Sequence, residues 1–256
     1  MDVAAVQLPA KNAPNENLDR AVSRIRDAAD AGAELVVLPE LWPVGYFAFD
    51  GYDDATESVP GETTDRLGVL ADDLSIYLHG GSVLEREGDG LYNTSPFFGP
   101  DGDLLATYRK MHLFGYESEE ARRLTPGSDA CAVETEFGTV GLTTCYDLRF
   151  PALYRSLVDK GVEMLLVTSA WPLERLDHWH LFARTRAIES QSILVAANLA
   201  GSIEGVDLAG ESVVIDSWGV ERANAGRAPG TARAEIDLDA VRDARATFPV
   251  LEDRQL

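Results

Sequence analysis

The chain alternates between short runs of apolar residues and longer stretches in which apolar positions recur every three or four residues. Apolar runs typical of strands that are buried on both faces lie at residues 3–8, 35–38, 164–168 and 193–198. Stretches with the spacing of a helix that has one apolar face lie at residues 18–29, 63–73, 151–158 and 178–191. The pattern predicts an α/β fold in which helices cover buried sheets.

Turn residues divide other segments into hairpins. Residues 91–98 and 104–108 flank a Gly-Pro-Asp-Gly turn, and residues 131–134 and 139–144 flank Gly138. Hairpins pair their strands antiparallel, so we expect the sheets to be mixed.

The rest of the chain continues the same alternation. Further strands are predicted at residues 76–83, 212–215 and 232–236. Asn15 or Asn17 is placed to cap the first helix, and Gly32 to end it. The sequence contains no internal repeat, no low-complexity tract and no linker rich in Gly, Pro or Ser. We therefore expect a single domain over residues 1–256.

The net charge of the chain limits the kinds of partner that it can bind. Acidic residues number 43 against 22 basic ones, which gives a net charge of −21. Such a surface repels nucleic acid and anionic membranes, so we expect neither as a partner and favour a small-molecule substrate. Nineteen of the basic residues are arginines and three are lysines. Acidic excess with little lysine suggests a halophilic cytoplasm, where salt screens self-repulsion.

The cysteines and the N-terminus indicate a compartment. Cys131 and Cys145 are too few for a disulfide framework in a chain of 256 residues, so we expect reduced thiols. The N-terminus runs directly into a predicted strand, and no apolar stretch reaches the length of a membrane span. These features predict a soluble, cytoplasmic protein.

Three side chains offer a chemistry. Glu40, Lys110 and Cys145 each directly follow a strand that we expect to be buried, so they can emerge at one edge of the sheets. Lys110 is one of the three lysines and lies in an apolar context. A carboxylate, an ammonium and a thiol held together can cleave an amide. Taken singly, each has a structural explanation: a buried thiol, a carboxylate at a helix start, a surface charge.

An ordered set of motifs accompanies these residues over essentially the whole chain. In chain order they are LPE at 38–40, GY at 45–46, YRKMHLF at 108–114, CYDLRFP at 145–151, AWP at 170–172, HW at 178–179, ARTRAIESQ at 183–191 and TFP at 247–249. With these motifs the chain resembles the nitrilase superfamily of carbon–nitrogen hydrolases, within it the omega-amidase-like, Nit-type branch.

The resemblance implies a four-layer αββα sandwich and a cofactor-free hydrolase that acts on carbon–nitrogen bonds. Glu40 would be the general base, Cys145 would carry the acyl group, and Lys110 would stabilise the oxyanion with a backbone N–H, that of Tyr146. A second glutamate, seven residues before Gly127, would orient the substrate and hold the lysine.

That spacing assigns the second glutamate to Glu120, with Glu117 and Glu119 as alternatives. The resemblance also implies a homodimer or a higher homo-oligomer, in which the C-terminal tail crosses to a partner copy. Relatives commonly have Asn-Arg where this chain has Asn198 and Leu199, and Pro in place of Ser217.

The favoured substrates by resemblance are omega-amides of short dicarboxylic acids, such as 2-oxoglutaramate. N-carbamoyl amino compounds and nitriles are alternatives, and so is a catalytically idle interaction subunit with the same fold. A redox protein that uses both cysteines is a third class, which an intramolecular disulfide would support.

Aromatic residues near the long loops at 45–61 and 114–127 suggest a narrow site for a short aliphatic chain. The candidates for lining it are Tyr46, Tyr116, Tyr146 and Trp171, while Trp42, Phe47 and Phe49 are as readily core as pocket. Arg149 either forms a structural ion pair with Asp147, the interpretation we favour, or binds a substrate carboxylate.

Other candidates are weaker. His112 could form a Cys–His dyad with Cys145, but the resemblance gives this position no catalytic role. His178 and His180 point to different faces of a helix, so we expect no metal site. Cys131 has no acidic or basic neighbour in its strand and is expected to be buried and inert.

Overall fold

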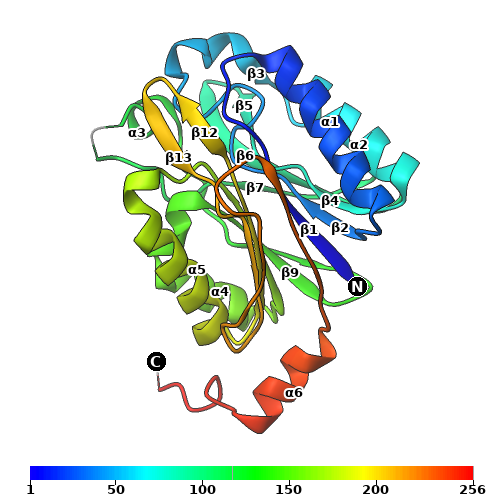
Figure 1. The fold of residues 1–256 in the computed structure, drawn as a ribbon. Helices are drawn as coiled ribbons and strands as arrows, with labels where there is room; N and C mark the ends of the chain where they lie inside the picture. The colour runs from blue at the N-terminus through cyan, green and yellow to red at the C-terminus, as the bar shows by residue number, and fades with distance from the viewer. Residues whose placement is uncertain (117, 256) are drawn as a thin grey trace.

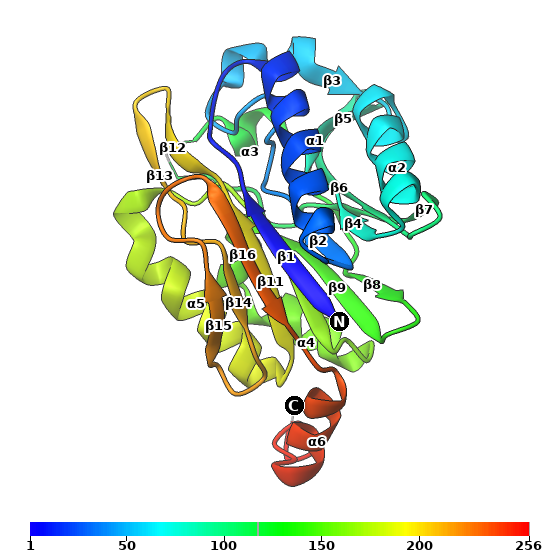
Figure 2. The ribbon, with the colours of Figure 1, turned by 45° about the vertical axis from the view of Figure 1, so that its right-hand side comes forward.

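Two β-sheets lie face to face between layers of helices in a computed structural model of the chain, which describes residues 1–116 and 118–255 (Figure 1). The strands of the first, eight-stranded sheet are β1 (Asp2–Gln7), β2 (Leu35–Val37), β3 (Thr56–Glu57), β4 (Tyr77–His79), β5 (Val83–Glu87), β6 (Gly90–Phe98), β7 (Leu104–Arg109) and β16 (Gly230–Glu235). Its order is β16-β1-β2-β4-β6-β5-β3, and β7 pairs with β6. Figure 2 shows β1 between β16 and β2.

The second sheet has six strands. They are β8 (Cys131–Glu134), β9 (Thr139–Thr144), β10 (Met164–Ser169), β11 (Ile193–Asn198), β14 (Val213–Ile215) and β15 (Glu221–Asn224). Its order is β15-β14-β11-β10-β9-β8, and a separate hairpin joins β12 (Ala200–Ile203) to β13 (Val206–Ala209). Strands β1, β2 and β4 are parallel to one another, as are β9, β10 and β11, while the hairpins are antiparallel. Both sheets are therefore mixed, as predicted.

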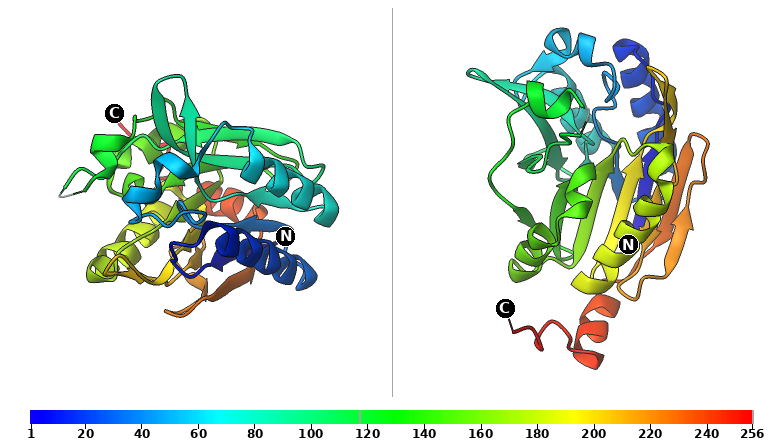
Figure 3. Two further views of the ribbon diagram at one scale, coloured as in Figure 1. Left: turned by 90° about the horizontal axis from the view of Figure 1, so that it is seen from above. Right: turned by 90° about the vertical axis from the view of Figure 1, so that its left-hand side faces the viewer.

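Helices cover the outer faces. The covering helices are α1 (Pro14–Asp30) and α2 (Glu62–Leu74) on the first sheet, and α4 (Pro151–Asp159) and α5 (Leu176–Ser190) on the second (Figure 1). Short α3 (Glu120–Arg123) lies in the loop after β7, and α6 (Asp239–Thr247) stands beyond the end of the sandwich (Figure 3). None of the helices in the described part of the chain is long and apolar enough to cross a bilayer.

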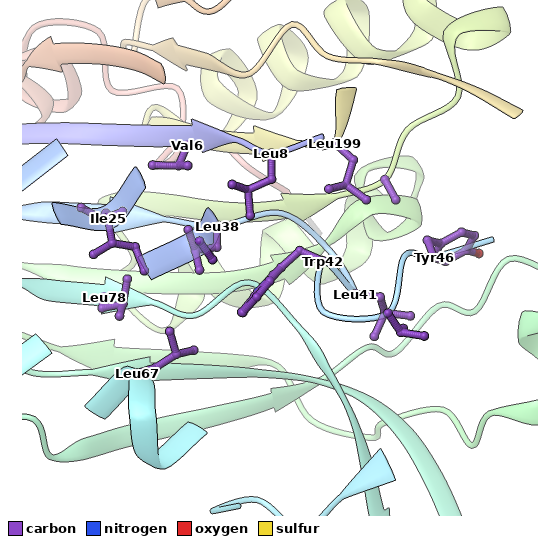
Figure 4. Packing of buried hydrophobic residues seen from close by; sticks show 14 of the residues in the cluster. Val6, Leu8, Ile25, Leu38, Leu41, Trp42, Tyr46, Leu67, Leu78 and Leu199 are labelled. Carbon is purple, nitrogen blue, oxygen red and sulfur yellow. The ribbon is translucent and has the colours of Figure 1, made fainter. Parts of the chain in front are cut away.

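Three apolar layers hold the sandwich together. Strand β2 supplies two of them, because Val36 packs with Ile25 beneath the helices while Val37 faces the other sheet. The third layer lies between the second sheet and its helices, where Leu165 packs with Leu157. Figure 4 shows the first of these layers. The layer order is αββα, which confirms the predicted fold.

The segment predicted as one strand at residues 76–83 is two strands, β4 and β5, separated by a glycine pair. Gly81 has a φ of +68°, and a Cβ on it would lie 2.2 Å from the Pro39 carbonyl oxygen. The Ser82 amide donates a hydrogen bond to that same oxygen at 3.2 Å. The chain thus breaks here because its backbone closely approaches the segment that carries Glu40.

The start of the first helix also differs from the prediction. Helix α1 begins at Pro14, and neither Asn15 nor Asn17 caps it. Asn17 is buried instead, and its Nδ2 donates hydrogen bonds to the carbonyl oxygens of Lys11 and Pro43 at 2.7 and 3.0 Å. Proline at the first helical position needs no partner for a backbone N–H, which leaves Asn17 free to anchor the neighbouring loops.

Candidate active site

Cys145 lies at the turn between strand and helix. It follows β9 directly and begins the 3-10 turn η3 (Cys145–Arg149) with a φ of +47°, a left-handed conformation that is uncommon for a residue with a side chain. Asp147 closes this turn by accepting a hydrogen bond from the Thr144 amide at 2.9 Å. The turn projects the thiol beyond the end of a central strand, as the sequence predicted.

Asp147 also fastens the Cys145 turn to the segment after β7. Its carboxylate accepts hydrogen bonds from the Tyr108 hydroxyl at 2.7 Å and from the His112 amide at 3.1 Å, and it lies 2.7 Å from Nδ1 of His112. The carboxylate is fully buried. Tyr108 and His112 flank Lys110 in the chain. By binding both, Asp147 fixes the backbone of Lys110 relative to Cys145.

Glu40 lies three residues after the end of β2 and is fully buried. Its backbone N–H donates to the Ser169 carbonyl at 3.2 Å, and its Oε2 accepts a hydrogen bond from the Ala170 amide at 3.0 Å. The carboxylate and the Cys145 thiol lie close enough for each to shift the pKa of the other. The carboxyl ends of β2, β9 and β10 therefore meet at one place, and the contacts between the sheets fix the carboxylate beside the thiol.

Lys110 follows β7 and is 1% exposed. Its Nζ lies 2.8 Å from Oε1 of Glu40 and 2.7 Å from Oε1 of Glu120. The strand before it differs from the prediction, because β7 pairs with β6 alone and is half exposed. The lysine is buried because the loop after β7 folds over it: the Gly127 amide donates to the Lys110 carbonyl at 2.9 Å.

Glu120 is the second glutamate of the site, at the first position of α3. It is fully buried, and its Oε2 accepts hydrogen bonds from the Tyr46 hydroxyl at 2.8 Å and the Phe114 amide at 2.6 Å. Glu119 turns away and pairs with Arg122 at 2.7 Å. Glu117, the other alternative, lies outside the described residues. Of Glu119 and Glu120, the structure brings Glu120 into contact with Lys110.

Asn93 joins the cluster without having been predicted. It lies in β6, and its Nδ2 is 2.9 Å from Oε1 of Glu40 and 3.3 Å from Oε1 of Glu120. Its side chain is buried. The available signal was the polar triplet at residues 93–95 inside an otherwise apolar strand, since buried polar groups need partners.

Burial and charge set the protonation of this cluster. Burial raises the pKa of Glu40; Lys110 offsets part of this shift, and the charge of Glu120 adds to it. Burial alone would lower the pKa of Lys110, but the charges of Glu120 and Glu40 outweigh burial and raise it. Burial and then the charge of Glu40 raise the pKa of Cys145. The resting thiol is therefore uncharged and needs a base to become a nucleophile.

A small pocket opens onto the thiol. Its cavity volume is about 30 Å³, well below the ~300–1,000 Å³ that is typical of small-molecule sites, so the pocket is narrow. Its lining residues are Tyr46, Phe47, Phe114, Cys145, Tyr146, Arg149, Ala170, Trp171, Pro172 and Arg175. Tyr46, Tyr146 and Trp171 were predicted for this role, and Arg149 was the alternative candidate for binding a substrate carboxylate. Tyr116 was also predicted but lies outside the pocket, and the residue is 65% exposed.

The expected ion pair between Asp147 and Arg149 does not form. Asp147 turns inward to Tyr108 and His112, whereas Arg149 lines the pocket. The guanidinium lies 5.0 Å from the centre of a Trp171 ring. Two residues apart on the tight turn η3, the two side chains point to different sides. Sequence reasoning missed Phe114 and Arg175 as lining residues, although Phe114 ends the motif at 108–114 and Arg175 lies three residues after the motif at 170–172.

The rival arrangements find little support in the geometry. The His112 ring binds Asp147 and stacks on Phe150 at 3.8 Å. Cys131 is half-buried in β8, and burial raises the pKa of its thiol to about 11. Within residues 1–116 and 118–255, no cluster of three or more His, Cys, Asp or Glu side chains is placed to hold a metal ion.

Comparison with known proteins places this geometry in a family. The carbon-nitrogen hydrolase family model matches residues 2–246. The chain is 38% identical to 2-oxoglutaramate amidase of Paenarthrobacter nicotinovorans, over 100% of this chain and 90% of that protein. It is 36% identical to omega-amidase NIT2 of Homo sapiens, over 99% of this chain and 94% of that protein.

A solved structure supports the same assignment. The crystal structure of Saccharomyces cerevisiae Nit3, a member of branch 10 of the nitrilase superfamily, superposes with a TM-score of 0.91 at 31% identity. The match covers 100% of this chain and 97% of that one. From its sequence and its fold alike, the chain belongs to the carbon–nitrogen hydrolase family.

Proposed function

We propose that this chain hydrolyses omega-amides of short dicarboxylic acids to a dicarboxylate and ammonia through a thioester on Cys145. One observation carries the proposal: a fully buried ammonium, Lys110, bridges two buried carboxylates, Glu40 and Glu120, beside a thiol that opens into a small pocket. This arrangement provides a base, a cation for an oxyanion and a nucleophile at one place. The omega-amide substrate is supported by the names of the two sequence relatives.

In the first half-reaction, Glu40 takes the proton of the Cys145 thiol as the sulfur attacks the amide carbon. A carbon–sulfur bond forms, and the carbonyl oxygen becomes an oxyanion that the Lys110 ammonium and the backbone N–H of Tyr146 stabilise. When the intermediate collapses, the carbon–nitrogen bond breaks and Glu40 passes its proton to the leaving nitrogen. Ammonia departs and the acyl group stays on sulfur. A raised pKa suits Glu40 to both tasks, because it brings proton uptake and release nearer to neutral pH.

In the second half-reaction, Glu40 removes a proton from water, which attacks the thioester carbon. The carbon–sulfur bond breaks, the proton on Glu40 returns to the sulfur of Cys145, and the new carboxylic acid leaves and loses its own proton to solvent. Lys110 again stabilises the oxyanion. Glu120 acts through the lysine, because its carboxylate holds Nζ at 2.7 and 3.0 Å while remaining fixed itself by Tyr46.

The pocket supports an anionic substrate of short length. Its walls are largely aromatic, and the cationic Arg149 lies among them. An amide carbon at Cys145 and a carboxylate near Arg149 would place the two ends of one short chain at opposite ends of the pocket.

The test is ammonia release from a panel of omega-amides, neutral amides, N-carbamoyl amino acids and nitriles. The proposal expects the highest kcat/KM for an omega-amide that bears a free carboxylate. A higher kcat/KM for a carbamoyl compound or a nitrile would redirect the assignment to those substrates. Folded protein that acts on none of them would support the idle interaction subunit.

We further propose that the chain forms a homo-oligomer. Several large apolar side chains are exposed on and near α5 and α6: Leu181, Ile188, Trp218 and Phe248. The rings of Trp218 and Phe248 stack at 6.4 Å. Exposed apolar groups of this size favour a covered surface. Light scattering of the purified chain tests this: a dimer or larger species is expected, and a monomer at micromolar concentration contradicts it.

A high-salt cytoplasm is the proposed working environment. The net charge of −21 destabilises the compact state through self-repulsion unless salt screens it. Screening shortens to about 3 Å at 1 M salt. Thermal unfolding between 0.1 and 3 M KCl is expected to show a rising Tm, and a Tm that is independent of KCl contradicts this proposal.

A further inference from the structure

Positive charge gathers at the pocket above Cys145, although the chain as a whole is strongly acidic. Of the side chains that line this pocket in the described part of the chain, Arg149 and Arg175 carry a charge at neutral pH, and none is a carboxylate. The net charge of the whole chain is −21. A pocket that is cationic on an anionic protein selects anions locally.

Arg149 has no carboxylate partner within residues 1–116 and 118–255, where its contacts are a histidine and aromatic rings. Its Nη2 lies 3.2 Å from Nδ1 of His178, and its guanidinium lies 5.1 Å from the centre of the Phe182 ring. Burial lowers the pKa of Arg149, and the charge of Arg175 lowers it further. Arg149 and Arg175 line the same pocket, so their like charges repel each other there, and an anion bound between them would relieve that repulsion.

Arg175 is held in place but is weakly paired. Its carbonyl oxygen accepts a hydrogen bond from Nε1 of Trp171 at 2.8 Å, and its guanidinium lies 5.7 Å from the centre of the Phe114 ring. Its ionic partner is Glu174 at 2.5 Å, whose side chain is 69% exposed. Because a pair with such an exposed carboxylate is weak, another carboxylate that enters the pocket can replace Glu174.

We propose that Arg175 is a specificity-determining residue, which together with Arg149 binds the free carboxylate of the substrate while the amide end reaches Cys145. The inference rests on the proposed function and deepens it. Glu174 is the resting partner of Arg175 and gives way when substrate enters. A neutral amide of equal length makes no charge-assisted contact here, so the second guanidinium favours monoamides of dicarboxylic acids over plain aliphatic amides.

The experiment compares two four-carbon amides, succinamate with a free carboxylate and butyramide without one. The ratio of kcat/KM for succinamate to kcat/KM for butyramide is measured in wild type, Arg175→Gln and Arg26→Gln. Arg26 lies on α1, where it pairs with Asp73 at 3.5 Å, so its substitution removes the same charge outside the pocket. We expect the ratio to fall about tenfold in Arg175→Gln, mainly through the KM of succinamate, and to stay within about twofold in Arg26→Gln.

Two further variants keep the inference testable. Arg175→Lys is expected to recover part of the lost ratio, because it retains the charge without the planar fork. Glu174→Gln removes the competing carboxylate and is expected to lower the KM of succinamate. This variant also tests the inference if Arg175→Gln fails to fold.

An unchanged ratio in Arg175→Gln, or an unchanged KM of succinamate in Glu174→Gln, overturns the inference and leaves the proposed function standing. A wild-type enzyme that prefers butyramide overturns it as well. Wild-type protein that releases ammonia from no amide contradicts the proposed function itself.

Discussion

Nζ of Lys110 lies 2.7 Å from Oε1 and 3.0 Å from Oε2 of Glu120, and both side chains are fully buried. A buried charge is stable only with partners, and here one ammonium faces the carboxylates of Glu120 and Glu40. Asn93 donates to both carboxylates. The lysine is therefore held by a carboxylate on each side, which leaves it charged and fixed beside Cys145.

Replacing Glu120 by glutamine is expected to reduce kcat by about 100-fold, because a lysine with one ionic anchor fewer is displaced from the oxyanion. The matched control is Glu119→Gln, one residue away, since Glu119 pairs at the surface with Arg122 and Arg123. That control should retain kcat within about twofold. Steady-state ammonia release measures both variants, and equal activities of the two would count against the assignment of Glu120.

The pH dependence of kcat/KM should report Glu40. Its pKa lies above the ordinary value of 4.5, mainly because of burial, and the base must be ionised to take the thiol proton. Activity is therefore expected to fall as the pH drops through this raised pKa, at a higher pH than for an ordinary glutamate.

The Glu120→Gln variant tests the direction of this pKa shift, because the charge of Glu120 contributes to the raised pKa of Glu40. Lys110 keeps its ion pair with Glu40 in this variant, so removing the charge of Glu120 should move the acid limb of the pH profile to lower pH. If the acid limb of the pH profile stays in place or moves to higher pH, a group other than Glu40 controls it.

His79 should make the fold sensitive to acid. The side chain is fully buried in β4, neither ring nitrogen meets a hydrogen-bond partner elsewhere in the described chain, and burial lowers its pKa from 6.5 to about 3. Between these values the unfolded state binds a proton that the folded state does not. The free energy of unfolding therefore has its full contribution from neutral His79 above pH 6.5. Below pH 6.5, down to about pH 3, this contribution falls by about 1.4 kcal/mol for each pH unit.

Urea unfolding of His79→Leu between pH 7 and pH 4 tests this expectation. The variant should lose less stability over that range than wild type, whereas His180→Leu should behave as wild type, because the His180 side chain is 47% exposed. Parallel pH dependences for wild type and His79→Leu would contradict the account of His79.

The layers of the fold could be predicted because periodicity reports burial directly. The runs at 35–38 and 164–168 became β2 and β10, and the turn at Gly138 became the β8–β9 hairpin. The strands β3, β12, β13 and β15 and the helices α3 and α6 were missed. Their sequences are short and partly polar, and their structure depends on contacts with distant segments, which periodicity does not record.

Within the site, the sequence was enough to predict which side chains take part, but not which way each side chain points. Glu40, Lys110 and Cys145 were predicted to meet, and they do. Arg149 was assigned to an ion pair with Asp147, but η3 is so tight that the two side chains point apart. Asn93 was missed because its role depends on two carboxylates 53 and 27 residues away in the chain. Contacts of this kind depend on the register between sheets, which local patterns leave open.

The most direct test of the account is ammonia release from an omega-amide by wild type, Cys145→Ala and Cys131→Ala under identical conditions. We predict that Cys145→Ala loses hydrolysis while its far-UV circular dichroism stays native, and that Cys131→Ala, which removes the other thiol of the chain, retains the wild-type rate. Residual turnover by Cys145→Ala at a rate near that of wild type would contradict the thioester mechanism. Loss of activity in Cys131→Ala would instead favour a function that needs both thiols.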